Sequence, residues 1–231
     1  MRNRTMLIAL AVTLAFAAGC SGSKSQKTSF ADNSSWGSRE LLDGARTSAL
    51  SSMKSASRRD AKAHAERGMD LAERCLMSAP EEPGCYYWRA VNTGLYYKVH
   101  IIGYQKGIRR MISDCKKVIE LKPGYDHAGA YRILGEIYTQ LPRTAGRPDS
   151  ITRDLDLAEE YLRKAVRLAP SYPENHLALA DTLFRNDRIK DALEELAQTK
   201  ELAPHWRTDA SYDDWRMSAR DLEKKIARAN R

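Results

Sequence analysis

The histidine and cysteine side chains are the groups in this sequence best suited to metal binding, proton transfer or covalent chemistry. Two histidines four residues apart on one helix face, or a Glu-x-x-His pair, would place two metal ligands together. The five histidines show neither spacing; they are His64, His100, His127, His176 and His205. The sequence also lacks a Gly-x-Ser-x-Gly segment and a phosphate-binding glycine-rich loop. It therefore predicts no metal site, no catalytic residue, no cofactor and no enzyme.

Three of the four cysteines fall within expected helical segments. Cys75 ends one such segment and Cys85 begins the next, so their Cα atoms could approach within the roughly 4.4 to 6.8 Å of a disulfide. A bridge between Cys85 and Cys115 is the competing pair. The third alternative is that all three are small buried residues at packing positions. Mass shifts on alkylation with and without reductant would separate these alternatives.

The fourth cysteine, Cys20, follows a short apolar segment with basic residues before it. Arg2 and Arg4 precede an apolar run over residues 6–19, which is shorter than the roughly 20 residues of a membrane-spanning helix. The segment Ala17-Ala18-Gly19-Cys20 resembles the lipobox of bacterial lipoproteins. That resemblance implies a signal peptide over residues 1–19, cleavage after Gly19, and a covalent diacylglycerol plus an acyl chain such as palmitate on Cys20.

Lipid attachment at Cys20 determines the expected location of the protein. Several acyl chains hold a protein on a bilayer, whereas one chain does so only marginally. Ser21 after the cysteine implies sorting to the bacterial outer membrane, with the chain facing the periplasm. Residues 20–37 are rich in serine and poor in large apolar residues, as expected of a flexible tether. The alternative is an ordinary secreted protein in which Cys20 is incidental.

The remaining chain, residues 38–231, has helical periodicity and no strand-like alternation. An internal repeat is visible in two places. Small and apolar residues recur at matching offsets over residues 131–170 and 176–204, and two weaker units end at Pro80 and Pro123. Residues 213–229 are predicted to form a helix that caps the stack. We therefore predict an all-α superhelix of about four helical hairpins, two of them degenerate.

The template of these units resembles the tetratricopeptide repeat. Gly135 and Ala180 would leave room where the first helix of a hairpin crosses the second, and Pro170 and Pro204 would end the second helices. Ser171 and Glu174 have the spacing of a capping box, with Ser171 as the expected N-cap. Two insertions lengthen the units, and residues 139–148, with two prolines and Leu141, are expected to form a fixed loop.

Four longer segments of the chain are similar to the T component of tripartite ATP-independent periplasmic (TRAP) transporters. They are Leu-Gly-Glu-Ile-Tyr-Thr-Gln-Leu-Pro, Asp-Leu-Asp-Leu-Ala-Glu-Glu-Tyr-Leu-Arg-Lys-Ala-Val, Leu-Ala-Pro-Ser-Tyr-Pro-Glu-Asn-His-Leu and Cys-Tyr-Tyr-Trp-Arg-Ala. The likeness covers about residues 38–204. It implies a periplasmic lipoprotein that associates with the transporter's substrate-binding component, in some members as a homo-oligomeric ring with a central pore.

Stacked hairpins of this kind bind partners on the concave face that their first helices form. Counting from the template, we expect this face to carry the candidate binding residues Tyr87, Val91, Arg132, Glu136, Asp181 and Phe184, together with Thr139, Glu174 and Leu177. The charged members could position a peptide or polar ligand, with the aromatic members as anchors. Alternatively, they could form ion pairs between neighbouring helices, which are worth little individually.

The charge of the chain narrows the choice of partner. Lys and Arg number 38 against 30 Asp and Glu, and some of the excess lies at Lys106, Arg109, Arg110, Lys116, Lys117 and Lys122. Export argues against a nucleic-acid partner, so this cluster indicates lipid headgroups, an acidic partner or a solvated helix face. The leading hypothesis is a non-catalytic scaffold for a TRAP substrate-binding protein. The alternatives are an envelope assembly scaffold for pilus or β-barrel biogenesis, and a direct small-molecule carrier.

Overall fold

A computed structural model describes residues 35–229, and this part of the chain is all α-helical. The predicted signal peptide, residues 1–19, and the predicted lipid attachment at Cys20 lie outside the described residues. The helices are α1 (Ser38–Lys54), α2 (Arg58–Ser78), α3 (Pro83–Val99), α4 (Tyr104–Leu121), α5 (Tyr125–Gln140), α6 (Leu155–Leu168), α7 (Pro173–Arg185), α8 (Ile189–Leu202), the 3₁₀ helix η1 (Ala203–Trp206) and α9 (Tyr212–Ala229). The predicted fold class is confirmed.

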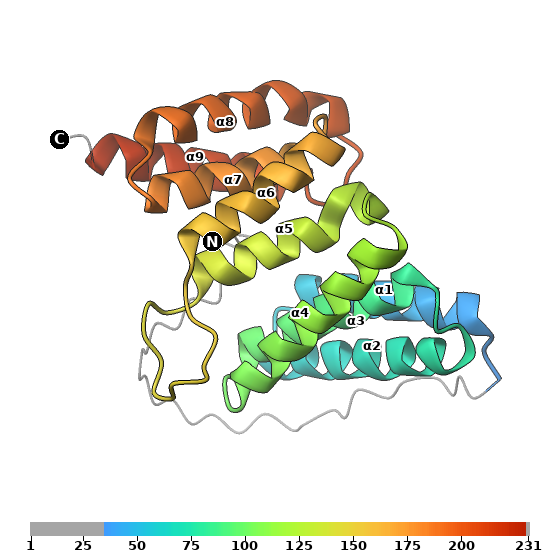
Figure 1. The fold of residues 1–231 in the computed structure, drawn as a ribbon. Coiled ribbons are helices and arrows are strands. Elements are labelled where there is room, and N and C mark those ends of the chain that lie inside the picture. The colour runs from blue at the N-terminus through green and yellow to red at the C-terminus, as the bar shows by residue number, and fades with distance from the viewer. Residues whose placement is uncertain (1–34, 230–231) are drawn as a thin grey trace.

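Helices α1 to α8 form four consecutive hairpins; in Figure 1, α1 to α4 make up the lower half of the molecule, and α5, α6, α7 and α8 lie above them. Each helix packs on the next one, and the first helices α3, α5 and α7 also contact one another. The repeated apolar positions form the core: Leu134, Leu162, Leu179 and Leu183 are fully or almost fully buried. The stack therefore has one helical layer formed by α3, α5 and α7.

The helix ends follow from their local sequence. Asp154 accepts a hydrogen bond from the backbone N–H of Leu157 and so caps α6. Helix α6 ends at Leu168, before Pro170, because proline cannot continue a helix. The predicted capping box at Ser171 is wrong: α7 begins at Pro173, whose missing N–H needs no cap, and Glu174 pairs with an arginine of α5 instead.

The predicted room at Gly135 is present at the crossing of α5 and α6. A Cβ atom added at Gly135 would overlap Cγ of Leu162, which is fully buried and cannot move away. No neighbouring atom would lie within 4 Å of a Cβ atom at Gly124, just before α5. The absence of a side chain at Gly135 therefore sets how closely these two helices approach.

We predict that Gly135→Ala destabilises the protein by about 1 to 2 kcal/mol. Overpacking in a core costs roughly 1 to 3 kcal/mol, and the higher helix propensity of alanine returns up to about 1 kcal/mol. Urea unfolding followed by circular dichroism measures the change, with Gly124→Ala as the matched control that should cost a few tenths of a kcal/mol at most. If both variants unfold at the same urea concentration, the close contact with Leu162 has no energetic weight.

Most of the predicted loop, residues 141–148, lies between α5 and α6, whereas Thr139 and Gln140 form the end of α5. The segment between the two helices is held against α4. Gln105 forms two hydrogen bonds with the backbone of Ile151, at 2.9 and 3.0 Å. Arg109 bonds both the backbone and the carboxylate of Asp149. Leu141 is buried in the core. The loop is visible in yellow at the left of Figure 1, and these contacts explain why the insertion keeps one conformation.

A disulfide joins Cys75 at the end of α2 to Cys85 at the start of α3, with 5.9 Å between their Cα atoms. It spans the turn that connects the first hairpin to the second. Cys115 is buried as a free thiol in α4, and burial raises its pKa well above the usual range. Of the pairings that the sequence leaves open, this geometry favours Cys75 with Cys85.

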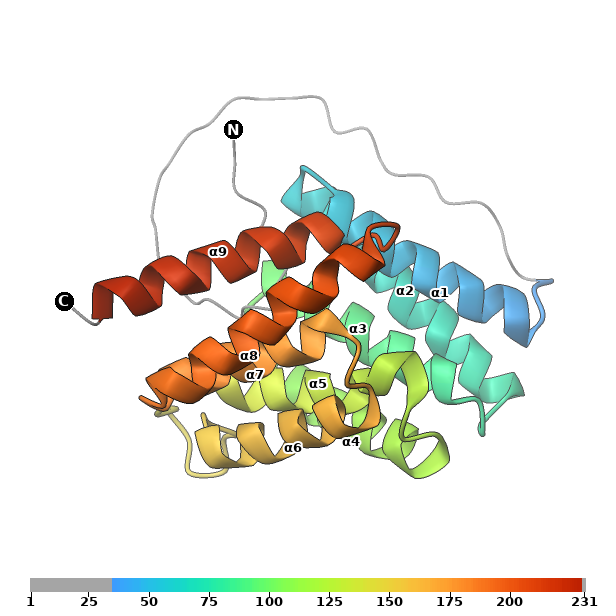
Figure 2. The same cartoon turned by 90° about the horizontal axis from the view of Figure 1, so that it is seen from above.

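Helix α9 lies beside α8 at the end of the stack, as Figure 2 shows. One face of α9 packs against α7 and α8 through Trp215, Ala219, Leu222 and Ile226, and its other faces are polar. A polar outer face is what ends a helical solenoid in water. None of the helices in residues 35–229 is both long and apolar enough to cross a membrane.

Candidate inner-face site

The six predicted binding residues lie on α3, α5 and α7, but most of them are buried. Val91 is part of the apolar core, and Phe184 is half-buried against the core beneath α7 and α8. Tyr87 is buried and donates a hydrogen bond to the carboxylate of Asp126. The three charged residues, Arg132, Glu136 and Asp181, are at most 6 % exposed. The inner layer therefore holds a charged network within the protein.

Arg132 is the centre of this network. Its Nη1 donates to Oδ1 of Asn175 at 2.9 Å, and its Nε lies 3.3 Å from a carboxylate oxygen of Glu174. The guanidinium also lies 5.1 Å from the centre of the Tyr172 ring, a cation–π distance. Burial alone would lower the pKa of Arg132, but Glu174 and the neighbouring groups outweigh it and raise the pKa. Arg132 is thus held charged inside the protein.

The turn into α5 brings a further carboxylate to Arg132. Asp126, His127 and Ala128 have φ angles of 48°, 56° and 61°, in the left-handed region that costs non-glycine residues roughly 1 to 2 kcal/mol each. The ring of His127 stacks on Tyr172 with 4.3 Å between centres, and its carbonyl accepts a hydrogen bond from Asn175. These contacts hold the turn, which places the Asp126 carboxylate 3.9 Å from Arg132.

Glu136 lies one helical turn beyond Arg132 and has no hydrogen bond to any described residue. Burial raises the pKa of Glu136 to about 8, and the nearby carboxylates of Glu174 and Asp181 add to the rise against the opposing effect of Arg132. Burial likewise raises the pKa of Glu174. The carboxyl groups around Arg132 outnumber the charge that its guanidinium can compensate, so Glu136 is protonated at neutral pH.

A row of polar contacts continues from Arg132 towards the C-terminal ends of α5 and α7. The hydroxyls of Thr139 and Thr182 lie 2.7 Å apart, and Gln140 donates to the carboxylate of Asp181 at 3.0 Å. Arg185 also donates to Asp181, at 2.8 Å. Residues 41 to 43 positions apart are thus paired along two neighbouring first helices, which fixes the register of one repeat on the next.

This row ends at an open groove between α7, α9 and the end of α5. The groove has a volume of about 510 Å³. Four of its ten lining residues are basic and two are acidic; the ten are Gln140, Leu177, Asp181, Arg185, Ser218, Asp221, Leu222, Lys224, Lys225 and Arg228. The hydroxyl of Ser218 is buried and has no hydrogen-bond partner among the described residues. A ligand with an acceptor group could therefore gain a bond there that the protein itself does not make.

Only part of the site predicted from the sequence lies in this groove. Asp181 and Leu177 line it, whereas Tyr87, Arg132 and Glu136 belong to the buried network behind it. The groove's basic residues on α9 were missed, since the sequence indicated a capping helix without showing which side it covers. Their only sequence signal is the adjacent pair Lys224 and Lys225, which lies outside the buried stripe of α9.

The histidine on α7 is held by a hydrogen bond at each of its ring nitrogens. His176 is buried, with one ring nitrogen 2.6 Å from Glu195 and the other 2.8 Å from the carbonyl of Pro170. Burial alone would lower the pKa of His176, but these two hydrogen bonds outweigh the effect of burial and raise the pKa. No cluster of three or more His, Cys, Asp or Glu residues in the described part of the chain could hold a metal ion.

Comparison with known proteins supports a repeat scaffold of this class. Residues 152–212, from just before α6 to the start of α9, match the tetratricopeptide repeat family. The fold is similar to the crystal structure of a thermophilic TPR protein from Thermus thermophilus, with a TM-score of 0.52, 21% identity, and coverage of 83% of this chain and 98% of that one. No curated protein sequence matches the chain.

The chain therefore has a helical-repeat fold similar to that of tetratricopeptide repeat proteins, and its residues 152–212 match the repeat family itself. Repeats of this type generally mediate binding to protein partners. The match covers the best-formed hairpin and the second helix before it, which are the units that the sequence spacing identifies most clearly.

Proposed function

We propose that this protein is a lipid-anchored periplasmic scaffold that binds a protein partner in the groove between α5, α7 and α9. The partner best suited to it is the substrate-binding component of a TRAP transporter, because the segments over residues 134–142 and 154–166 resemble the T component. Cys20 would carry the diacylglycerol and acyl chains on the outer membrane. About 17 tether residues would then keep the helical domain within roughly 20 to 25 Å of the leaflet.

The groove is the observation that carries the binding role. It is large enough for several side chains of an extended segment, since ligand sites commonly measure about 300 to 1,000 Å³. Four cations line it against two carboxylates, so it favours a segment with an excess of acidic residues. The unpartnered hydroxyl of Ser218 adds one buried group for a backbone or side-chain acceptor.

Reversal of one groove charge should weaken partner binding about tenfold. Lys225→Glu would place a carboxylate opposite the acidic segment, and a like-charge contact costs on the order of 1.4 kcal/mol or more, which is tenfold in affinity. The measurement is the dissociation constant for the partner recovered with the protein from detergent-solubilised membranes. Lys190→Glu, an exposed lysine of α8 outside the groove, is the matched control and should leave the constant unchanged.

The two parts of this proposal fail separately. Recovery of the protein without any extracytoplasmic substrate-binding protein would contradict the TRAP role. Recovery with pilus or β-barrel assembly proteins would instead support an envelope assembly scaffold. Equal affinity of the Lys225→Glu variant and the unaltered protein for a recovered partner would contradict the groove as its site.

A further inference from the structure

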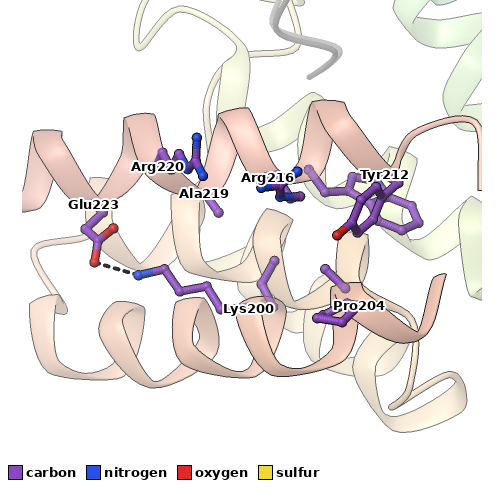
Figure 3. Close-up of a pocket in the computed structure, with 10 residues that line it drawn as sticks. Lys200, Pro204, Tyr212, Arg216, Ala219, Arg220 and Glu223 are labelled. Carbon is purple, nitrogen blue, oxygen red and sulfur yellow. Dashed lines mark hydrogen bonds and ion pairs between the residues drawn. The ribbon is translucent and has the colours of Figure 1, made fainter. Parts of the chain in front are cut away.

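A second cavity lies on the other side of α9, between that helix and α8, and has a volume of about 260 Å³ (Figure 3). It opens away from the groove of the proposed function and shares no lining residue with it. We call it the α8–α9 cavity. Its lining comprises Thr199, Lys200, Ala203, Pro204, Tyr212, Trp215, Arg216, Ala219, Arg220 and Glu223.

The inner wall of the α8–α9 cavity is apolar. Trp215, Ala203 and Ala219 are buried there, and Tyr212 and Pro204 lie at one end, as Figure 3 shows. The Nε1–H group of Trp215 is buried and has no hydrogen-bond partner among the described residues. A buried donor without a partner costs free energy, so a ligand acceptor that reached it would be stabilised. This wall is suited to a flat apolar or aromatic body.

The rim of the α8–α9 cavity is cationic. Lys200 pairs with Glu223 at 2.5 Å at the end opposite Tyr212 (Figure 3), and Arg216 lies 5.4 Å from the centre of the Tyr212 ring. Arg220 is exposed between these two ends and makes no hydrogen bond or ion pair with the described residues. The guanidinium of Arg220 is therefore available to a ligand. A guanidinium can donate two parallel hydrogen bonds to one carboxylate.

We propose that the α8–α9 cavity binds a small amphiphilic carboxylate, with its aromatic or apolar body against Trp215 and its carboxylate at Arg220. The volume is below the roughly 300 Å³ at which drug-sized ligand sites begin, so the ligand is a small molecule. A further helix packed on this cavity would bury Lys200, Arg216 and Arg220. The charged rim therefore favours a small ligand over a packed helix. This site is independent of the groove that receives the protein partner.

Titration of the full-length protein with indole-3-acetate and phenylacetate tests this proposal. The readout is the indole N–H resonance of Trp215 in a nitrogen-15 correlation spectrum, assigned by its absence from Trp215→Phe. We expect a saturable shift with either carboxylate and at least a tenfold weaker response to indole-3-ethanol, which has the same ring system without the charge. No saturable shift at millimolar probe, or an equal response to the alcohol, would overturn the proposal.

Two variants locate the probe in the cavity. Ala219→Leu fills the space and should abolish the shift, and Arg220→Gln should weaken binding about tenfold, since a charge-assisted hydrogen bond is worth roughly 1.5 to 3 kcal/mol. Arg167→Gln, the same change at an exposed position of α6, is the control and should leave the dissociation constant of the probe unaltered. Unchanged affinity in Arg220→Gln would overturn the proposal even if Ala219→Leu failed to fold. Neither outcome bears on the groove, whose test is recovery of a protein partner.

Discussion

Replacement of Glu136 by glutamine should stabilise the protein by about 3 to 5 kcal/mol at pH 8 and by little at pH 4.5. The pKa of Glu136 rises from its ordinary value of 4.5 to about 8 in the folded protein, because the carboxyl is buried beside Glu174. A rise of this size corresponds to several kcal/mol, at about 1.36 kcal/mol for each pH unit. Glutamine has the same shape and carries no charge, so it removes the cost of ionising the buried group.

The sign of this effect follows from proton linkage. Between pH 4.5 and 8 the unfolded chain loses the Glu136 proton while the folded protein keeps it, so the stability of the unaltered protein falls as pH rises through this range. His176, whose pKa is also raised, contributes a loss of the same sign. The decisive quantity is therefore the difference between the two proteins, measured by urea unfolding at several pH values.

A matched control separates burial from charge alone. Glu160 is exposed on α6 and pairs with Lys164 four residues along, a surface contact worth a few tenths of a kcal/mol. Glu160→Gln should therefore change stability by less than about 0.5 kcal/mol at every pH. Parallel stability profiles for Glu136→Gln and the unaltered protein would show that the Glu136 carboxyl ionises freely in the folded state.

Replacement of Arg132 by methionine should cost about 3 kcal/mol or more at neutral pH. Loss of one partner from a buried ion pair typically costs roughly 3 to 5 kcal/mol, because the other charge is left uncompensated. The lower part of this range applies, since the Glu174 side chain is 20 % exposed and keeps some contact with water. The change also removes the hydrogen bond to Asn175 and leaves Asp126 without its guanidinium neighbour.

Two further variants test this account of Arg132. Arg163→Met removes an arginine that is 40 % exposed and pairs with Glu159 within α6, and it should cost less than about 1 kcal/mol. The double variant Arg132→Met with Glu174→Gln should recover part of the loss, because it removes the uncompensated carboxylate as well. If the two single arginine variants unfold at the same urea concentration, the network at Arg132 does not stabilise the fold.

Local sequence patterns were sufficient to predict the repeat fold. Whether Leu134, Ala158 and Leu162 face a neighbouring helix depends on helical periodicity and on contacts within one hairpin, both of which the spacing displays. The prolines end helices through their own backbone, and the small residues at the helix crossings allow close approach through their own lack of bulk. Both effects depend on the residue type alone and can therefore be predicted from the sequence. Ser171 is the exception, because Pro173 and the pairing of Glu174 decided where α7 begins.

The helical hairpins, their order and the residues of the inner layer could be predicted without a structure, because they depend on spacing along one chain. The burial of Arg132 and Glu136 in a network, and the position of Asp181 at an open groove, could be seen only in the folded molecule. That outcome depends on how closely α5 approaches α7, whose paired residues lie 41 to 43 positions apart, and on which side α9 covers. The spacing of a charged residue along the chain is the same whether water or a neighbouring repeat surrounds its side chain. The two cases differ in the free energy of burying the charge, which depends on partners that only the folded structure supplies.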